Sequence, residues 1–182
     1  MTVIAYRAGF MACDSCWASY GTQTVSAIKI IRLSSGALLG SAGDNDCRAM
    51  YALLDRIKDP RKLPTRAELA ATKLDYEGLI AFQKGGVYLI STGRHDDNGY
   101  PLGEDGSEES DADYGVWSAT TMGGYAACGS GGDMALLAMD AHPSVSAKKA
   151  VELACKRSIH CTLPVHVLRL HPMPSPIKRK RK

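Results

Sequence analysis

The segment that decides the fold lies at residues 2–15, which have the sequence TVIAYRAGFMACDS. Two short apolar runs, 2–7 and 9–14, meet at an Ala-Gly pair, and this pattern is typical of two strands joined by a tight turn. The sequence therefore predicts a hairpin at the start of the fold, with Thr2 at the first position of a β-sheet.

Beyond this hairpin, the apolar periodicity predicts separate groups of strands and helices. Further strands are expected at 26–33, 37–42, 79–82, 87–91, 125–128 and 165–170, and helices at 44–58, 133–142 and 146–156. A loop with Gly21 is expected between the hairpin and the strand at 26–33. Residues 59–76 contain two prolines and are expected to form a connection with one helical turn, and residues 93–115 a long exposed loop. This order favours an α+β fold of two antiparallel sheets with helices outside over a parallel βαβ layout.

The composition is that of one globular domain. The chain has 182 residues, of which 45% are hydrophobic and 23% charged, so it is long enough to bury a core. No apolar run approaches the roughly 20 residues of a membrane helix, and the start MTVIAYRAGF lacks the pattern of a signal peptide. We therefore predict a cytoplasmic protein with one domain over residues 2–170, no membrane contact and no cofactor.

The basic character of the chain belongs to its last residues. The net charge is +3, and removing the five consecutive basic residues at 178–182 leaves −2. We interpret the Pro-rich and basic segment 171–182 as a solvated tail rather than a nucleic-acid or acidic-partner contact. No nucleic-acid partner is expected.

The six cysteines, at positions 13, 16, 47, 128, 155 and 161, lie mostly in apolar segments. Cys13 and Cys16 form a C-x-x-C pair, but a zinc site would require a second pair, which the sequence lacks. In a strand, side chains at these positions point to opposite faces. We therefore predict reduced core residues and no metal site, with metal or redox use of the pair as the minor alternative.

Four motifs, taken in order, carry a resemblance to a known family. They are TVIA at 2–5, MACDS at 11–15, IKIIRL at 28–33 followed by SAGD at 41–44, and CGSGG at 128–132. Together they make the chain similar to the proteasome β-subunits, and especially to the small bacterial subunits of the HslV kind. The resemblance covers most of residues 2–170 and is weakest across 59–120. It implies a four-layer αββα sandwich, the fold of N-terminal-nucleophile hydrolases.

The resemblance also implies a threonine peptidase. In the family, an N-terminal threonine hydroxyl is the nucleophile and its own α-amine is the base. An α-amine titrates near 7.7–8, so it can accept the hydroxyl proton near neutral pH. Here that residue is Thr2, and removal of Met1 would expose its amine.

Four further residues match the family's catalytic set. Lys29 matches the lysine whose charge lowers the pKa of the amine, and Asp14 matches the carboxylate that holds the lysine. Gly43 matches the residue whose N–H forms the oxyanion hole, and Ser130 the serine beside the amine. Taken singly, three of them have ordinary explanations: Lys29 as a solvated side chain, Asp14 as a turn or cap residue and Ser130 as a helix cap. Only the joint pattern favours catalysis.

The resemblance further suggests the pocket for the residue that precedes the cut peptide bond. Its lining would come from Ala27, Ser41 and Asn45, which are small or polar and uncharged. We therefore expect no strong demand for an acidic or basic substrate side chain at this position.

Two departures from the family pattern leave an alternative open. Cys16 stands where members often carry an arginine, and residues 156–161 lack the late aspartate, whose place Ser158 or His160 could take. The alternative is therefore a catalytically weakened or inactive ring or scaffold protein of the same fold. A small-amide hydrolase with the same nucleophile is a third option without specific support.

The resemblance also implies partners. Family members stack two six- or seven-membered rings and are usually served by an ATP-dependent unfoldase. We therefore expect copies of this chain, protein or peptide substrates and an unfoldase as partners.

Overall fold

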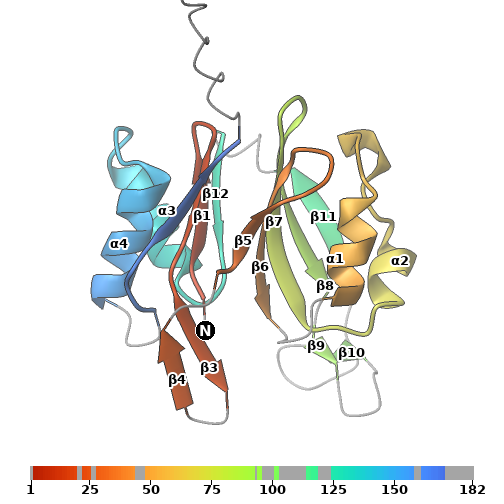
Figure 1. The fold of residues 1–182 in the computed structure, drawn as a ribbon, viewed down its shortest axis with the longest axis horizontal. Helices are drawn as coiled ribbons and strands as arrows, with labels where there is room; N and C mark the ends of the chain where they lie inside the picture. The colour runs from red at the N-terminus through yellow and green to blue at the C-terminus, as the bar shows by residue number, and fades with distance from the viewer. Residues whose placement is uncertain are drawn as a thin grey trace, which may run out of the picture.

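The fold is known from a computed structural model, in which two antiparallel sheets face each other and helices cover both outer faces (Figure 1). The structure describes residues 2–19, 22–25, 28–43, 48–92, 94–95, 101–102, 114–118, 124–157 and 161–170. Four layers, helices–sheet–sheet–helices, follow from this arrangement. The predicted α+β fold with an αββα sandwich is confirmed.

The first sheet is built around the predicted N-terminal hairpin. Its strands, in the order β12-β1-β2-β13, are β12 (Tyr125–Cys128), β1 (Ile4–Arg7), β2 (Phe10–Cys13) and β13 (His166–Arg169). The hairpin turn has positive φ at both Ala8 (49°) and Gly9 (82°). Two-residue turns with this backbone match the twist of the flanking strands, which explains the Ala-Gly pair.

The second sheet contains five strands in the order β11-β8-β7-β6-β5. They are β5 (Ile30–Arg32), β6 (Leu38–Gly43), β7 (Tyr76–Phe82), β8 (Gly86–Thr92) and β11 (Tyr114–Ser118). Its outer face is covered by α1 (Arg48–Asp55) and α2 (Arg66–Ala70), with a short 3₁₀ turn, η1 (Pro60–Lys62), between them. A capping box between Thr65 and Glu68 starts α2.

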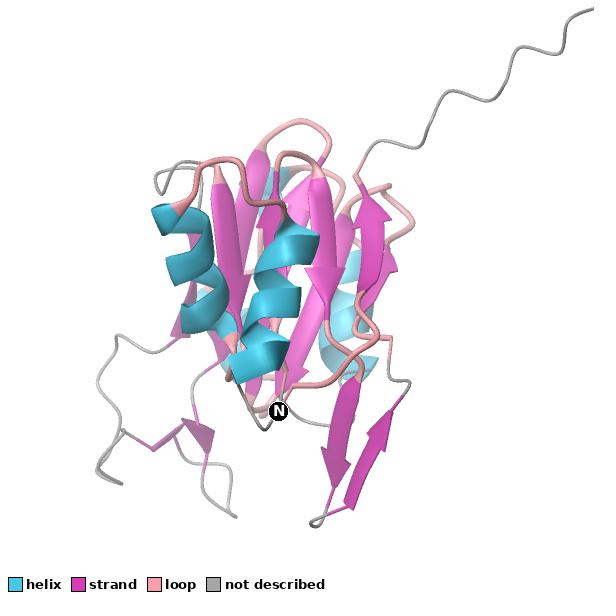
Figure 2. Ribbon diagram, turned by 90° about the vertical axis from the view of Figure 1, so that its left-hand side faces the viewer, coloured by secondary structure: helices cyan, strands magenta, loops and turns pink. Residues whose placement is uncertain are grey.

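The outer face of the first sheet is covered by α3 (Gly132–Ala141) and α4 (Ala147–Arg157), which lie in front of the strands in Figure 2. Helix α4 follows from its sequence, because its buried residues Ala147, Ala150, Val151 and Ala154 recur at helical spacing on one face. No helix in the described part of the chain has the length and apolar character needed to cross a bilayer.

Three apolar clusters fill the spaces between the four layers. Ile4 lies in the cluster between the sheets, whereas its neighbours Val3 and Ala5 lie in the cluster under α3 and α4. This alternation is the period of two expected for a strand buried on both faces. At Gly40, a Cβ would lie 2.6 Å from Ile4 Cγ2, so the glycine allows β6 to approach β1 closely.

Two expectations were wrong. The region after Asp14 was expected to be a loop with Gly21, but it contains β3 (Cys16–Ser19) and β4 (Thr22–Val25), a separate two-stranded ribbon. The expected loop at 93–115 contains β9 (Arg94–His95), β10 (Pro101–Leu102) and the start of β11. Strand β11 pairs with β8 at the edge of the second sheet, and such pairing depends on a distant partner rather than on local pattern.

Candidate active site

Thr2 is the first described residue and is held by the turn between β12 and α3. Its backbone N–H donates to Ser130 Oγ over 3.0 Å, and its carbonyl oxygen accepts from Gly131 N–H over 3.1 Å. The residue is only 8% exposed. Both backbone polar groups of Thr2 are therefore fixed by Ser130 and Gly131, which lie 128 and 129 positions further along the chain.

Contact with Thr2 requires a glycine at position 129 of this turn. Gly129 has φ of +80°, and a Cβ there would overlap the Thr2 carbonyl oxygen and lie 3.2 Å from Thr2 Cβ. The N-cap of α3 is Gly131, without a side-chain capping bond. Ser130 is thus not the helix cap that its position alone favours, since its hydroxyl faces Thr2 instead.

Asp14 is fully buried next to Val3, the residue that follows Thr2. Its carboxylate accepts from Val3 N–H and Cys16 N–H, both over 2.9 Å, and from Lys29 Nζ over 2.8 Å. In return, Asp14 N–H donates to the Val3 carbonyl oxygen over 3.1 Å. Asp14 therefore anchors the start of the chain to the lysine, because one carboxylate oxygen, Oδ1, contacts both Val3 N–H and Lys29 Nζ.

Lys29 directly precedes β5, and its side chain is not solvated. It is 9% exposed and forms an ion pair with Asp14. Its carbonyl oxygen accepts from Ser41 N–H over 2.9 Å, which places β6 next to it. The structure therefore brings together Thr2, Asp14, Lys29 and Ser130, four residues from separate segments of the chain.

The other predicted site residues have different outcomes. Ser41 lies on β6 and its hydroxyl is 3.1 Å from the hydroxyl of the buried Tyr76. Gly43 is the last residue of β6, and the lower ends of β6 and of the ribbon β3–β4 lie on the side of the molecule where the chain begins (Figure 1). The oxyanion role of Gly43 stays a prediction. Ala27 and Asn45 lie outside the described residues.

The described cysteines are thiols rather than disulfides, and in the described part of the chain no group of three or more His, Cys, Asp or Glu residues could hold a metal ion. Cys13 ends β2 in the core between the sheets, whereas Cys16 begins β3. Burial raises the pKa of the Cys13 thiol to about 11 and that of Cys155 to about 12. Both thiols are therefore protonated at neutral pH and are poor nucleophiles.

Backbone groups of the segment before β13 contact Asp14 and the adjacent Ser15. Thr162 N–H lies 3.4 Å from Asp14 Oδ2, Ser15 N–H donates to the Thr162 carbonyl oxygen, and the Ser15 hydroxyl donates to the carbonyl oxygen of Pro164. Ser158 and His160, the suggested substitutes for the late carboxylate, lie outside the described residues. No motif in the sequence pointed to Thr162.

One further polar group next to the site was missed. Glu77 on β7 accepts from Gly129 N–H over 2.9 Å. Burial raises the pKa of its carboxyl group, the Gly129 N–H opposes this shift, and the charges of Asp133 and Asp75 add to it. A single acid within the apolar strand sequence YEGLIAF is the signal that could have identified it.

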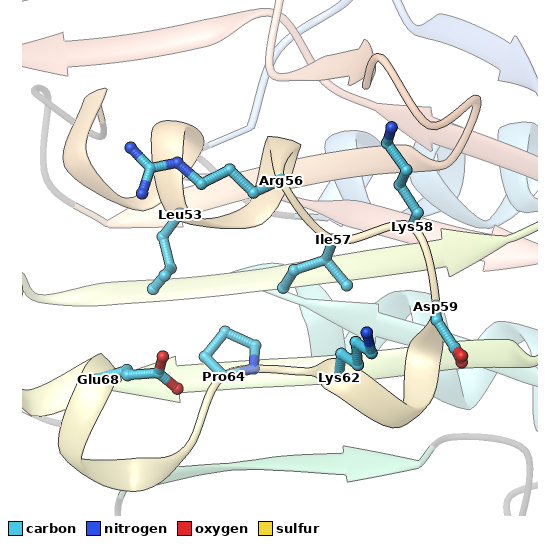
Figure 3. Close-up of a pocket in the computed structure, with 8 residues that line it drawn as sticks. All are labelled: Leu53, Arg56, Ile57, Lys58, Asp59, Lys62, Pro64 and Glu68. Atoms are coloured by element: carbon cyan, nitrogen blue, oxygen red, sulfur yellow. The ribbon is translucent and has the colours of Figure 1, made fainter.

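A separate cavity of about 380 Å³ lies between α1 and the segment that leads to α2 (Figure 3). Three cationic side chains, from Arg56, Lys58 and Lys62, and the apolar Leu53, Ile57 and Pro64 line it, together with Asp59 and Glu68. None of the candidate site residues contributes to this lining. The arrangement around Thr2 is therefore independent of this cavity.

The αββα layers are those of the proteasome β-like fold of N-terminal-nucleophile hydrolases. BPH of Thiobacillus denitrificans, a bacterial proteasome homologue solved in complex with epoxomicin, matches with a TM-score of 0.57 at 19% identity, over 94% of this chain and 99% of BPH. A second BPH structure matches with a TM-score of 0.56 at 19% identity, over 94% and 98%.

Eukaryotic HslV from Trypanosoma brucei matches with a TM-score of 0.52 at 16% identity, over 92% of this chain and 98% of HslV. No family model and no curated protein sequence matches the chain. The likeness to BPH and HslV establishes the fold.

Proposed function

We propose that this protein is an N-terminal threonine endopeptidase, with Thr2 as the nucleophile. The observation that carries the proposal is the polar cluster around Thr2, in which Ser130 Oγ accepts from its nitrogen and Asp14 joins Val3 N–H to the Lys29 ammonium. A purely structural role for this cluster leaves a lysine at 9% exposure unexplained, because burying an ion pair gives little net stability.

The chemistry begins with removal of Met1, which turns the Thr2 nitrogen into an α-amine. This amine accepts the proton of the Thr2 hydroxyl while the hydroxyl oxygen attacks the substrate carbonyl carbon. The Lys29 ammonium favours the neutral amine and the developing negative oxygen. The tetrahedral intermediate collapses when the amine returns the proton to the leaving nitrogen, and water then hydrolyses the threonyl ester.

The proposal also assigns the oxyanion contact and the substrate pocket, to Gly43 and to Ala27, Ser41 and Asn45 respectively. Gly43 N–H would stabilise the oxyanion, a contribution of about 2.7–4 kcal/mol for one such donor in other hydrolases. The other three would line the pocket for the residue before the cut bond. No strong demand for an acidic or basic residue before the cut bond is expected.

Intact-mass measurement with an epoxyketone tests the nucleophile. BPH, which shares the fold, was solved in complex with epoxomicin. An epoxyketone reacts with both the hydroxyl and the free amine of an N-terminal threonine, so the processed chain should gain one inhibitor mass. Thr2→Ala and a form that retains Met1 should gain none, and Thr2→Ala should lose peptide hydrolysis. Full hydrolysis by Thr2→Ala would exclude Thr2 as the nucleophile.

The proposal includes assembly into two stacked rings of six or seven subunits, with the sites facing an inner chamber. An ATP-dependent unfoldase would deliver protein substrates to that chamber. Both partners come from the resemblance to proteasome β-subunits.

The alternative is a ring or scaffold protein with a weakened site. It is favoured by the closure over Asp14, where Thr162 contributes a backbone N–H and Cys16 replaces the frequent arginine. A processed chain with a free Thr2 amine that forms no epoxyketone adduct and cleaves no peptide would support this alternative.

A further inference from the structure

Glu77 is a charged residue in a strand whose other residues are apolar. Strand β7 has the sequence YEGLIAF, and all its residues except Glu77 are buried. Within the described part of the chain, Glu77 forms no ion pair with a lysine or arginine. A half-buried carboxylate with no cationic partner among the described residues lowers stability through its lost hydration, so its position calls for a functional explanation.

The carboxylate connects the two sheets at the candidate site. Glu77 belongs to the second sheet, whereas Gly129 directly follows β12 of the first sheet, and the bond from Gly129 N–H to Glu77 Oε2 measures 2.9 Å. The two residues are 52 positions apart in the sequence. A hydrogen bond to a charged acceptor is stronger than one between two neutral groups.

The turn that this bond holds is the turn that holds Thr2. Gly129 lies against Thr2 with no room for a side chain, Ser130 Oγ accepts from the Thr2 nitrogen, and Gly131 N–H donates to the Thr2 carbonyl oxygen. A shift of Gly129 would therefore move both polar contacts of Thr2. Asp14 holds the other side of the same segment through Val3.

We propose that Glu77 is a positioning residue for the Thr2 nucleophile, because it anchors Gly129 to the second sheet and so fixes Ser130 Oγ on the Thr2 amine. This inference rests on the proposed peptidase function. Glu77 acts through the turn and does not touch the reacting atoms. Displacement of a reacting group by about 1 Å can lower a rate about a hundredfold, so such an anchor affects turnover more than substrate binding.

The test compares Glu77→Gln and Glu77→Leu in the full-length, processed protein. The glutamine carbonyl oxygen can accept the same bond from Gly129 N–H, whereas leucine keeps bulk and strand propensity but removes the acceptor. Glu77→Leu should lower kcat for peptide hydrolysis about tenfold or more with KM within about twofold, and Glu77→Gln should recover kcat to within about threefold. Glu152→Gln is the matched control and should change neither constant, because Glu152 is a partly exposed carboxylate on α4 that pairs, among the described residues, only with Lys148 and Lys149.

Two further measurements separate the outcomes. Thermal melting reports whether Glu77→Leu is folded, and Glu77→Ala replaces it if it is not. Epoxyketone labelling of the wild type reports on the nucleophile itself. If the wild type forms an adduct and Glu77→Leu keeps its kcat, the positioning role is refuted while the peptidase stands. If the processed wild type neither forms the adduct nor cleaves peptides, the peptidase proposal fails, and the positioning role fails with it.

Discussion

Asp14 has no exposed surface, and Lys29 is its ion-pair partner at 2.8 Å. Both groups lose hydration in this position, and the pair is stable because the remaining acceptor sites of the carboxylate are filled by Val3 N–H and Cys16 N–H. Removal of one member therefore has a larger effect than loss of one bond, since the other charge stays buried without compensation.

Asp14→Asn should accordingly destabilise the protein by about 3–5 kcal/mol, because it leaves the Lys29 ammonium without its anion. Urea denaturation at constant protein concentration measures this change. Asp59→Asn is the control, since the Asp59–Arg61 pair is exposed at the surface and its loss should have little effect. Equal midpoints for Asp14→Asn and wild type would contradict the role of the buried pair.

Glu77 gives a second prediction at this scale, on pH. Burial raises the pKa of Glu77 in the folded protein, with Asp133 and Asp75 adding to the shift and Gly129 N–H opposing it. The folded state therefore holds this proton to higher pH than the unfolded state, whose pKa is about 4.3. Wild type loses stability as the pH rises through the raised pKa, whereas Glu77→Gln does not.

The stability gain of Glu77→Gln over wild type should thus be near zero below about pH 4 and largest at neutral pH. Urea denaturation at the two pH values measures it. A gain that is larger at the acidic pH than at pH 7 would show that the carboxyl group is not destabilised by burial.

At the scale of elements, the turn between β12 and α3 sets the position of Thr2, because it binds both backbone polar groups of that residue. Gly129→Ala should reduce the rate of epoxyketone labelling at least tenfold, because its Cβ would displace the Thr2 carbonyl. Gly9→Ala is the matched control, since Gly9 has nearly the same φ (+82° against +80°) and open space around its Cβ position. Both substitutions introduce backbone strain of about 1–2 kcal/mol, so only Gly129→Ala should affect labelling.

At the scale of the whole molecule, α3 presents apolar side chains to solvent. Met134 and Leu137 are 44% and 69% exposed. Apolar residues three apart on a helix share one face, so the pair is suited to an interface between subunits. We expect the wild type to form particles of two stacked six- or seven-membered rings, and Leu137→Glu to yield smaller particles.

Light scattering at micromolar concentration measures the particle mass. Lys84→Glu, in the exposed turn between β7 and β8, is the control for a change of charge and should leave the mass unchanged. A monodisperse wild-type monomer would exclude the ring.

The local sequence alone predicted the elements that are formed by residues close together in the chain. The N-terminal hairpin follows from its alternation and its Ala-Gly turn, and α4 from apolar residues at helical spacing. The cluster of Thr2, Asp14, Lys29 and Ser130 could also be predicted, although only through the resemblance, because no periodicity relates residues so far apart.

Tertiary structure alone decided the rest. Strand β11 forms through pairing with the distant strand β8, and a short strand without regular alternation carries little local signal. The contact between Glu77 and Gly129 joins two sheets across 52 residues. From sequence alone, Glu77 is one acid in an apolar strand, and only the packing of the two sheets brings its carboxylate to the turn that holds Thr2.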